Sequence, residues 1–281
     1  MKGVSIREIA PGLQLAEYDR YDYELAASLL DRCTHPVVPA CSCIRNGDFA
    51  GRNFDWHINF KPVTVVRMSN ACARFASIGV VGNFDWLNGL GDDMLPMLPV
   101  LVCDGMNEQG LQVSASMVPA GESDLNPAVW QLRTWGLGAA FTHPELPQAH
   151  CSCSIIRYVL DNAASVREAL EMVEANNWFD PVGLFSSSER PSSFHWLISD
   201  RRESAFLEFI GNRMEYSITD AVREPSLCTL MTNFYHVLHK NNLFPTFAAG
   251  YERFDLMKEL YAGASDEEGL CEVLKSVRMS G

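Results

Sequence analysis

The sequence is poor in positive charge. Lysine and arginine together number 22 against 35 aspartates and glutamates, which gives a formal net charge of −13 at pH 7. Nucleic acids are bound largely through clustered lysine and arginine side chains that displace counterions from phosphates. The charge balance therefore argues against nucleic acid and anionic membrane surfaces as partners.

Long hydrophobic runs are also missing. The N-terminal segment lacks the apolar run of about 7 to 15 residues of a signal peptide, and no later stretch approaches the roughly 18 apolar residues of a membrane span. We therefore expect a cytoplasmic protein without a membrane span. With 281 residues, of which 47% are hydrophobic, the chain can bury a sizeable core, and we expect one main domain.

The nine cysteines do not form a recognisable disulfide or zinc pattern. Their number is odd and they are scattered along the chain, unlike a disulfide framework. Two C-x-C pairs occur, at residues 41/43 and 151/153, whereas structural zinc sites use C-x2-4-C pairs or matching histidines. We expect no metal and no other cofactor, with most thiols reduced and buried.

The order of predicted elements indicates an α+β sandwich. Strands are predicted near residues 61–69, 73–81, 98–107 and 110–118, two helices within 155–177 with Ser165 as a cap, a hairpin over 193–217, a strand over 227–234 and a last helix over 250–264. A helical pattern over 16–33 precedes two prolines, so residues 1–40 are predicted to form an appended leader. This order favours four layers: helix, sheet, sheet, helix.

A hairpin is predicted around Asn46-Gly47, which is a strong type I′ turn signal. If these two residues form the turn, Cys41 stands opposite Arg52, and Cys43 faces only Ala50. A guanidinium beside a thiol favours the thiolate, which is the nucleophilic form. Cys41 is therefore the candidate nucleophile.

Several motifs, beginning with CSCI at residues 41–44 and GRNFDW at residues 51–56, together resemble those of the choloylglycine hydrolase, penicillin V acylase and acid-ceramidase-like group of Ntn-hydrolases. The sequence CSCI is similar to the group's Cys-Thr-Ser-Ile, and GRNFDW to its Gly-Arg-Asn-x-Asp-Trp. The likeness covers most of the chain from residue 41 to about residue 262. It continues through DGMNEQGL (104–111), VLDNAASVREAL (159–170), HWLISDRRESAFLEF (195–209) and MTN (231–233).

The resemblance implies a four-layer αββα Ntn-hydrolase sandwich, with two antiparallel sheets between helical layers, over residues 41–281. It further implies that autocatalytic cleavage between Ala40 and Cys41 frees an α-amine that acts as the base. Arg52 is implied to polarise the thiol and to help anchor substrate, and Asp55 to hold the α-amine. Because residues 52 and 55 differ in parity, one of them must lie beyond a bulge or at the strand end.

The remaining implied site residues lie farther along the chain. Asn233 matches the group's side-chain donor to the oxyanion, and Arg253 matches a late arginine that supports the nucleophile and Asp55. Met117 stands where group members carry Asn or Tyr as a second donor, so only a backbone N–H remains there. Met117 and Trp56 are expected to contact substrate. Asp104 and Asn107, in DGMNEQGL, are interpreted as turn formers rather than catalysts.

These features predict a hydrolase of linear, non-peptide amides, acting on a small N-acyl compound with an apolar acyl part. Two alternatives stay open: an acyltransferase of the penicillin acyltransferase type, in which an amine takes the acyl group, and an unprocessed, non-catalytic binding protein of the same fold. A Cys-His thiol protease is disfavoured because no histidine stands in a signature beside a candidate nucleophile. An unpaired sheet edge would favour a homo-oligomer.

Overall fold

The described residues of the first half of the chain lie mainly in strands, as the alternation of apolar residues predicts. The computed structural model of the protein describes residues 4–10, 13–18, 40–55, 61–83, 99, 101–119, 149–179, 192–210, 213–220, 229–237 and 250–279. Its first eight strands are β1 (Val4–Ala10), β2 (Leu13–Tyr18), β3 (Ala40–Asn46), β4 (Phe49–Asp55), β5 (Lys61–Arg67), β6 (Ser77–Asn83), β7 (Val102–Asn107) and β8 (Gln112–Pro119). The strands predicted between residues 61 and 118 are thereby confirmed.

The second half adds helices and further strands. A short pair of parallel strands, β9 (Ala149–Cys151) and β10 (Asn177–Phe179), encloses the 3-10 turn η3 (Ser152–Ser154) and the helices α4 (Ile155–Asn162) and α5 (Val166–Glu174). The hydroxyl of Ser165 accepts the backbone N–H of Glu168, which confirms the predicted cap. Then follow β11 (Ser192–Ser199), β12 (Glu203–Ile210), β13 (Arg213–Asp220), β14 (Leu230–Met231), α7 (Tyr251–Tyr261) and α8 (Glu267–Ser276), of which α8 was not predicted.

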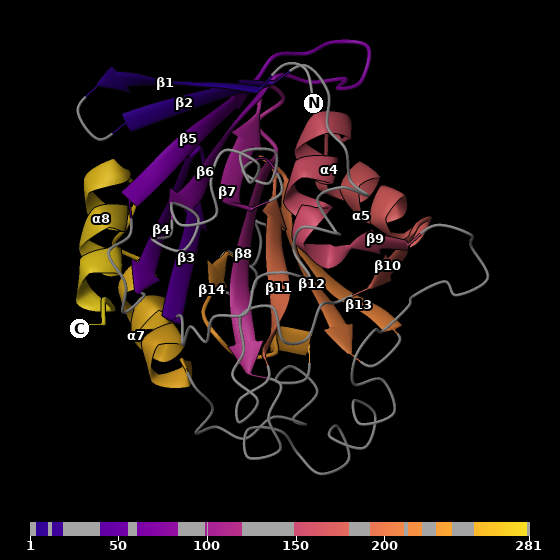
Figure 1. The fold of residues 1–281 in the computed structure, drawn as a ribbon. Helices are drawn as coiled ribbons and strands as arrows, with labels where there is room; N and C mark the ends of the chain where they lie inside the picture. The colour runs from indigo at the N-terminus through magenta and orange to yellow at the C-terminus, as the bar shows by residue number, and fades with distance from the viewer. Residues whose placement is uncertain are drawn as a thin grey trace.

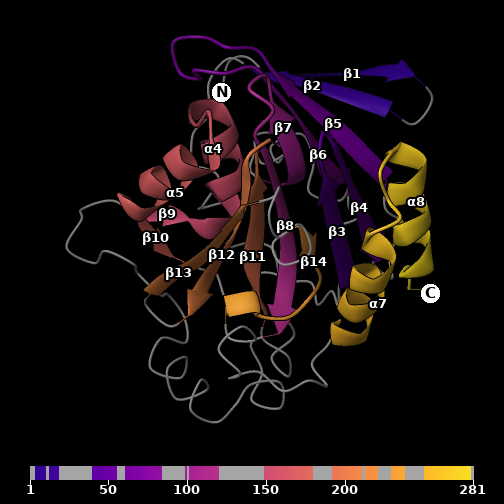
Figure 2. The same ribbon diagram turned by 180° about the vertical axis from the view of Figure 1, so that it is seen from behind.

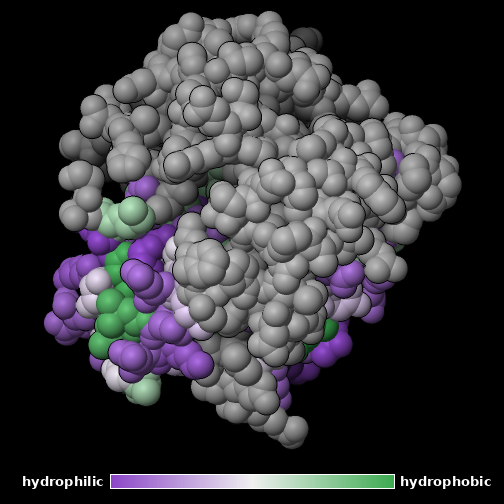
Figure 3. Space-filling view, turned by 90° about the horizontal axis from the view of Figure 1, so that it is seen from below, coloured by the Kyte–Doolittle hydropathy of each residue, from purple (hydrophilic) through white to green (hydrophobic). Residues whose placement is uncertain are grey.

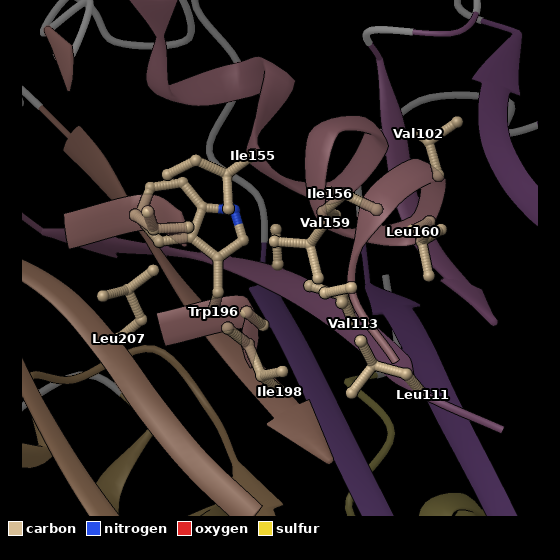
Figure 4. Close-up of a cluster of buried hydrophobic side chains, with 14 of the residues drawn as sticks. Val102, Leu111, Val113, Ile155, Ile156, Val159, Leu160, Trp196, Ile198 and Leu207 are labelled. Carbon is tan, nitrogen blue, oxygen red and sulfur yellow. The ribbon is translucent and has the colours of Figure 1, made fainter. Parts of the chain in front are cut away.

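A nine-stranded sheet forms the centre of the molecule (Figure 1), in the order β1-β2-β5-β6-β7-β8-β11-β12-β13. Helices α4 and α5 cover one of its faces. Their apolar side chains pack on inward-facing residues of the strands, and Figure 4 shows Ile155, Ile156, Val159 and Leu160 of α4 above Val113 and neighbouring strand residues. Burial of this cluster is the main stabilising contact between the helices and the sheet.

A three-stranded sheet, in the order β14-β3-β4, packs on the opposite side. Helices α7 and α8 cover it in turn, and Figures 1 and 2 show them on the side of the molecule away from α4 and α5. The layers thus run helix, sheet, sheet, helix, and the predicted α+β αββα sandwich is confirmed. Pairing within the two sheets is antiparallel except between β2 and β5, which run parallel.

The segment before Cys41 is not wholly an appendage. Strands β1 and β2 form one edge of the large sheet, and β2 pairs with β5 through Leu15 opposite Thr64 and Ala16 opposite Val65. The helix predicted over 16–33 is therefore wrong at residues 16–18, because pairing with a neighbouring strand overrides a local helical pattern. Residues 19–33 lie outside the described part of the chain.

The layer between the two sheets combines apolar and polar side chains. Its apolar cluster consists of Cys43, Leu197, Phe206 and Met231. Buried polar residues on the same strand faces are Ser114, Ser116, His195 and Glu208. Buried polar groups are costly unless they are hydrogen-bonded, so their concentration in this layer marks it as the place to look for chemistry.

The outer surface of α7 includes exposed apolar side chains. Leu256 and Leu260 are each 38% exposed. Seen from below, the molecule shows a small hydrophobic group bordered by hydrophilic residues on the side where α7 lies (Figure 3). Among the described helices, none is both long and apolar enough to cross a membrane.

Candidate active site

The register of the β3–β4 hairpin differs from the prediction. Asn46 pairs with Phe49, so the two turn residues are Gly47 and Asp48, and Gly47 takes a φ of 56°. Left-handed φ values favour glycine, and either Asn-Gly or Gly-Asp is compatible with such a turn. The shift places Phe54 opposite Cys41 and Arg52 opposite Cys43. The predicted pairing of Cys41 with Arg52 is therefore wrong.

Arg52 nevertheless contacts the thiol of Cys41. The two side chains share one face of the hairpin as diagonal neighbours, and Nη2 of Arg52 lies 3.2 Å from Sγ of Cys41. Nη1 donates to the carbonyl of Cys103, and the guanidinium carbon lies 3.8 Å from the centre of the Phe54 ring. Burial alone would lower the pKa of Arg52, but the neighbouring thiols and Asp104 raise it above its ordinary value. The guanidinium therefore stays charged beside Cys41.

Cys43 lies close to Cys41 on the same strand and is equally buried, but its thiol is less suited to attack. It is 1% exposed, as is Cys41, and its Sγ lies 3.7 Å from the hydroxyl of Ser116. Burial raises the pKa of the Cys43 thiol to about 12, although Arg52 acts in the opposite direction. Since the thiolate is the nucleophile, Cys43 is unsuited to attack at neutral pH.

The main-chain atoms of Cys41 are held by two polar side chains from distant segments. Its N–H donates to Oδ1 of Asn233 at 2.8 Å, and its carbonyl accepts from Nη1 of Arg253 at 3.0 Å. Nη2 of Arg253 also donates to Oδ1 of Asn233 at 2.6 Å. Asn233 and Arg253 therefore form one bonded frame around the backbone nitrogen and carbonyl of the candidate nucleophile.

Asp55 is the last residue of β4, which agrees with the expectation that residue 52 or 55 stands at the strand end. Its Oδ2 lies 3.6 Å from Nη1 of Arg253. Burial raises the pKa of Asp55, while an N–H of Met279 and the charge of Arg253 act in the opposite direction. Asp55 was expected to hold the nitrogen of Cys41. Among the described contacts, Asp55 instead pairs with Arg253, and the side chain of Asn233 accepts the N–H of Cys41.

Comparison with known proteins places this site in a family. A family model described as acyl-coenzyme A:6-aminopenicillanic acid acyl-transferase matches residues 44–279. The chain belongs to this family. The match confirms the resemblance drawn from the sequence motifs, and its range includes Arg52, Asp55, Asn233 and Arg253 but begins after Cys41.

The other comparisons add a distant similarity to a solved structure. No curated protein matches the chain. Among solved structures, that of a single-residue variant of conjugated bile acid hydrolase from Clostridium perfringens is similar with a TM-score of 0.44 at 16% sequence identity, over 88% of this chain and 75% of that chain.

Met117, one of the two residues expected to contact substrate in this acyl-transferase family member, has its side chain elsewhere. The Met117 side chain packs in the core beneath α4 and α5, because residues 113, 115 and 117 of β8 face the helices. Its carbonyl, however, accepts from Nδ2 of Asn233 at 2.7 Å. That bond uses one of the two hydrogens of the amide group expected to serve the oxyanion, while Oδ1 of the same side chain accepts the N–H of Cys41. Trp56 lies outside the described residues.

Asp104 is a site neighbour that the sequence interpretation missed. It lies within β7 rather than in a turn, and the hydroxyl of Ser114 donates to it. Burial raises the pKa of Asp104, and the nearby charge of Arg52 opposes this rise. The available signal was a single carboxylate inside an apolar strand run. Asn107, by contrast, accepts backbone N–H groups in the β7–β8 turn, as predicted.

From the sequence we expect mostly reduced, buried thiols and no metal site. The seven cysteines that the structure describes are free, in line with the expectation of reduced thiols. The expectation that most are buried is too broad, since three of these seven, Cys41, Cys43 and Cys151, are buried and Cys72 and Cys271 are exposed. No group of three or more His, Cys, Asp or Glu side chains suited to a metal ion occurs within the described ranges.

Gly250 gives a prediction about the frame around Cys41. It takes a φ of 83°, and a Cβ there would lie 2.9 Å from the backbone nitrogen of Asn233 and 3.0 Å from Oγ1 of Thr232. Gly250→Ala is therefore expected to lower the free energy of unfolding by roughly 1–3 kcal/mol and to displace Asn233, with a loss of activity. Gly110→Ala is the matched control, because Gly110 also has a positive φ, 78°, but nothing within 4 Å of its added Cβ.

Chemical denaturation of both variants, together with their reaction rates, tests this prediction. We expect both substitutions to show backbone strain and only Gly250→Ala to lose activity as well. Equal activity in the two variants would show that close packing of Gly250 against Asn233 does not matter for the site.

Proposed function

We propose that the protein cleaves a linear, non-peptide amide of a small N-acyl compound, with Cys41 as the nucleophile after the chain is cut between Ala40 and Cys41. The observation that carries this proposal is the contact of 3.2 Å between Nη2 of Arg52 and Sγ of Cys41. Arg52 is partly buried, and among the described residues no carboxylate forms a hydrogen bond with its guanidinium. Removing a cation from water costs free energy unless a negative charge compensates it. The thiolate form of Cys41 would supply that negative charge.

The surroundings of the Cys41 nitrogen support the proposed base. Once Ala40 is removed, this nitrogen becomes an α-amine, whose ordinary pKa of about 8 suits proton transfer near neutral pH. Oδ1 of Asn233 already accepts a hydrogen from this nitrogen, and Arg253 holds both Asn233 and the Cys41 carbonyl. The amine would therefore be oriented without a histidine. Arg253 in turn is paired with Asp55.

In the proposed reaction the α-amine takes the proton of the Cys41 thiol, and the resulting thiolate attacks the amide carbonyl to form a tetrahedral intermediate. The α-ammonium group then gives its proton to the leaving amine, and the carbon–nitrogen bond breaks to leave a thioester on Cys41. Water, deprotonated by the α-amine, then adds to the thioester carbonyl, and the carbon–sulfur bond breaks to release the acid while the proton returns to Sγ of Cys41. Neither step requires a metal ion or a redox partner.

The name of the matched family favours a second candidate, acyl transfer. In that reaction an amine rather than water attacks the same thioester, so the nucleophile and its frame serve both. Adding a primary amine to the reaction separates the two: a transferase forms the new N-acyl amine faster than the free acid, whereas a hydrolase releases free acid at an unchanged rate.

The first test is the intact mass and N-terminal sequence of the purified full-length protein. The proposal predicts a chain that begins at Cys41. It also predicts that the N-terminal fragment stays bound under native conditions, because β2 pairs with β5 in the large sheet. Cleaved protein should then release acid from a panel of N-acyl amino acids, acyl amides, penicillin V and conjugated bile acids. A stable chain beginning at Met1 would instead favour the unprocessed binding protein.

A further inference from the structure

A buried histidine–glutamate pair lies behind the candidate site, on the face of the large sheet that meets the small sheet. His195 on β11 stands directly opposite Glu208 on β12, and the two are 1% and 0% exposed. Nδ1 of His195 lies 3.2 Å from Oε1 of Glu208. None of the proposed catalytic steps uses this pair, yet two buried ionisable groups are costly to keep without a role.

The pair bonds the backbone of the segment that carries Asn233. Oε1 of Glu208 accepts the N–H of His236 at 2.6 Å, and Oε2 accepts the N–H of Val237 at 3.0 Å. Nε2 of His195 lies 2.8 Å from the carbonyl of Thr232. The two side chains therefore hold the segment 232–237 at both of its ends, with Asn233 next to the residue that His195 contacts.

The same segment connects to the helix that carries Arg253. Oγ1 of Thr232 donates to the carbonyl of Gly250 at 2.9 Å, directly before α7 begins. One end of this chain of contacts is the large sheet, through His195 and Glu208. The other end is the pair of side chains that bond the backbone of Cys41. Displacement of Thr232 would consequently move both Asn233 and Arg253.

The direction of the His195 bond follows from its partner. A carbonyl oxygen only accepts hydrogen bonds, so Nε2 must carry the hydrogen that it shares with Thr232. This bond is the direct connection between His195 and the residue preceding Asn233. The bond from Nδ1 to Glu208 orients the ring, as second partners commonly do for functional histidines.

We propose that His195, oriented by Glu208, is a positioning residue whose Nε2–H bond to the Thr232 carbonyl places Asn233 against the nitrogen of Cys41. The inference rests on the proposed function, since it assigns this bond a role in the reaction of Cys41. His195 does not touch substrate in this role. It acts through Thr232 and Asn233.

Two amide substitutions separate the two ring nitrogens. In His195→Gln the side-chain N–H donor lies as many bonds from the main chain as Nε2 of histidine, so it can reach the carbonyl of Thr232. In His195→Asn the donor lies as many bonds away as Nδ1, so it cannot reach Thr232. Both replace the imidazole ring by a neutral amide, so each is a control for the other. We expect His195→Asn to lower kcat about 10- to 100-fold with KM within about threefold, and His195→Gln to stay within about fivefold of wild type.

Three measurements on the full-length variants test the inference. These are the rate of self-cleavage, kcat and KM on the best substrate of the wild type, and hydrogen exchange of the peptide spanning residues 229–237. Equal kcat values in the two variants, at equal thermal stability, would overturn the positioning role. So would a loss that appears in KM alone.

Failure of the proposed function gives a different pattern. In that case the wild type itself neither cuts its chain nor hydrolyses any substrate, and hydrogen exchange alone decides whether His195 holds the segment. Faster exchange over 229–237 in His195→Asn than in His195→Gln would support the bond to Thr232. Identical exchange in the two variants would overturn it.

Discussion

Cys41→Ala is expected to leave the chain uncut and to abolish amide hydrolysis, with a loss of about 10⁴-fold or more in kcat/KM. The reason is that this thiol is the proposed nucleophile for both reactions, and alanine offers no atom that can form the thioester. The substitution removes one sulfur from a buried position, so the fold should survive with a cost of about 1 kcal/mol. Intact mass and a hydrolysis assay measure the two activities separately.

Cys43→Ala is the control that the hairpin itself provides. Cys43 lies two residues away on the same strand and the same face, is equally buried, and stands directly opposite Arg52. Burial raises the pKa of its thiol to about 12, so it remains a thiol where Cys41 is proposed to act. We expect Cys43→Ala to keep most of both activities. If Cys43→Ala were inactive and Cys41→Ala active, the nucleophile would have been assigned to the wrong cysteine.

The layers of the fold could be predicted because hydrophobic periodicity reports directly which face of an element is buried. The hairpin register could not, since Asn46-Gly47 and Gly47-Asp48 are both compatible with a tight turn. Moving the turn by one residue moved the partner of Cys41 from Arg52 to Phe54. That displacement is two residues along β4, so Arg52 kept its face, and its long side chain reaches the diagonal neighbour.

The distant parts of the site depended on other signals. Asn233 and Arg253 were found through family motifs, because nothing local indicates that a strand end and a helix will meet the backbone of residue 41. Gly250 gave no such signal, and His195 and Glu208 lay within the motif HWLISDRRESAFLEF without a role of their own. Their importance appears only when Thr232 is seen to contact both Gly250 and His195. Contacts between segments far apart in sequence are the part of a site that local patterns do not encode.

Arg52→Lys is expected to lower kcat about 10- to 100-fold even though the positive charge is kept. The guanidinium of Arg52 makes two contacts at once, from Nη1 to the carbonyl of Cys103 and from Nη2 to Sγ of Cys41, and it also lies on the ring of Phe54. A lysine ammonium is a point charge on a flexible chain and cannot reproduce this fork or the stacking. Arg52→Met, which also removes the charge, should cost more, on the order of 10² to 10³-fold.

Arg45→Lys is the matched control for this prediction. Arg45 is a buried arginine of the same hairpin, but its guanidinium contacts the carbonyl of Gly47 and the side chain of Gln112 rather than Cys41. Its replacement is expected to affect thermal stability more than kcat. Steady-state kinetics and self-cleavage rates of the three variants, measured beside their unfolding midpoints, separate the two effects. Equal losses in Arg45→Lys and Arg52→Lys would mean that Arg52 supports the hairpin and has no special role toward the thiol of Cys41.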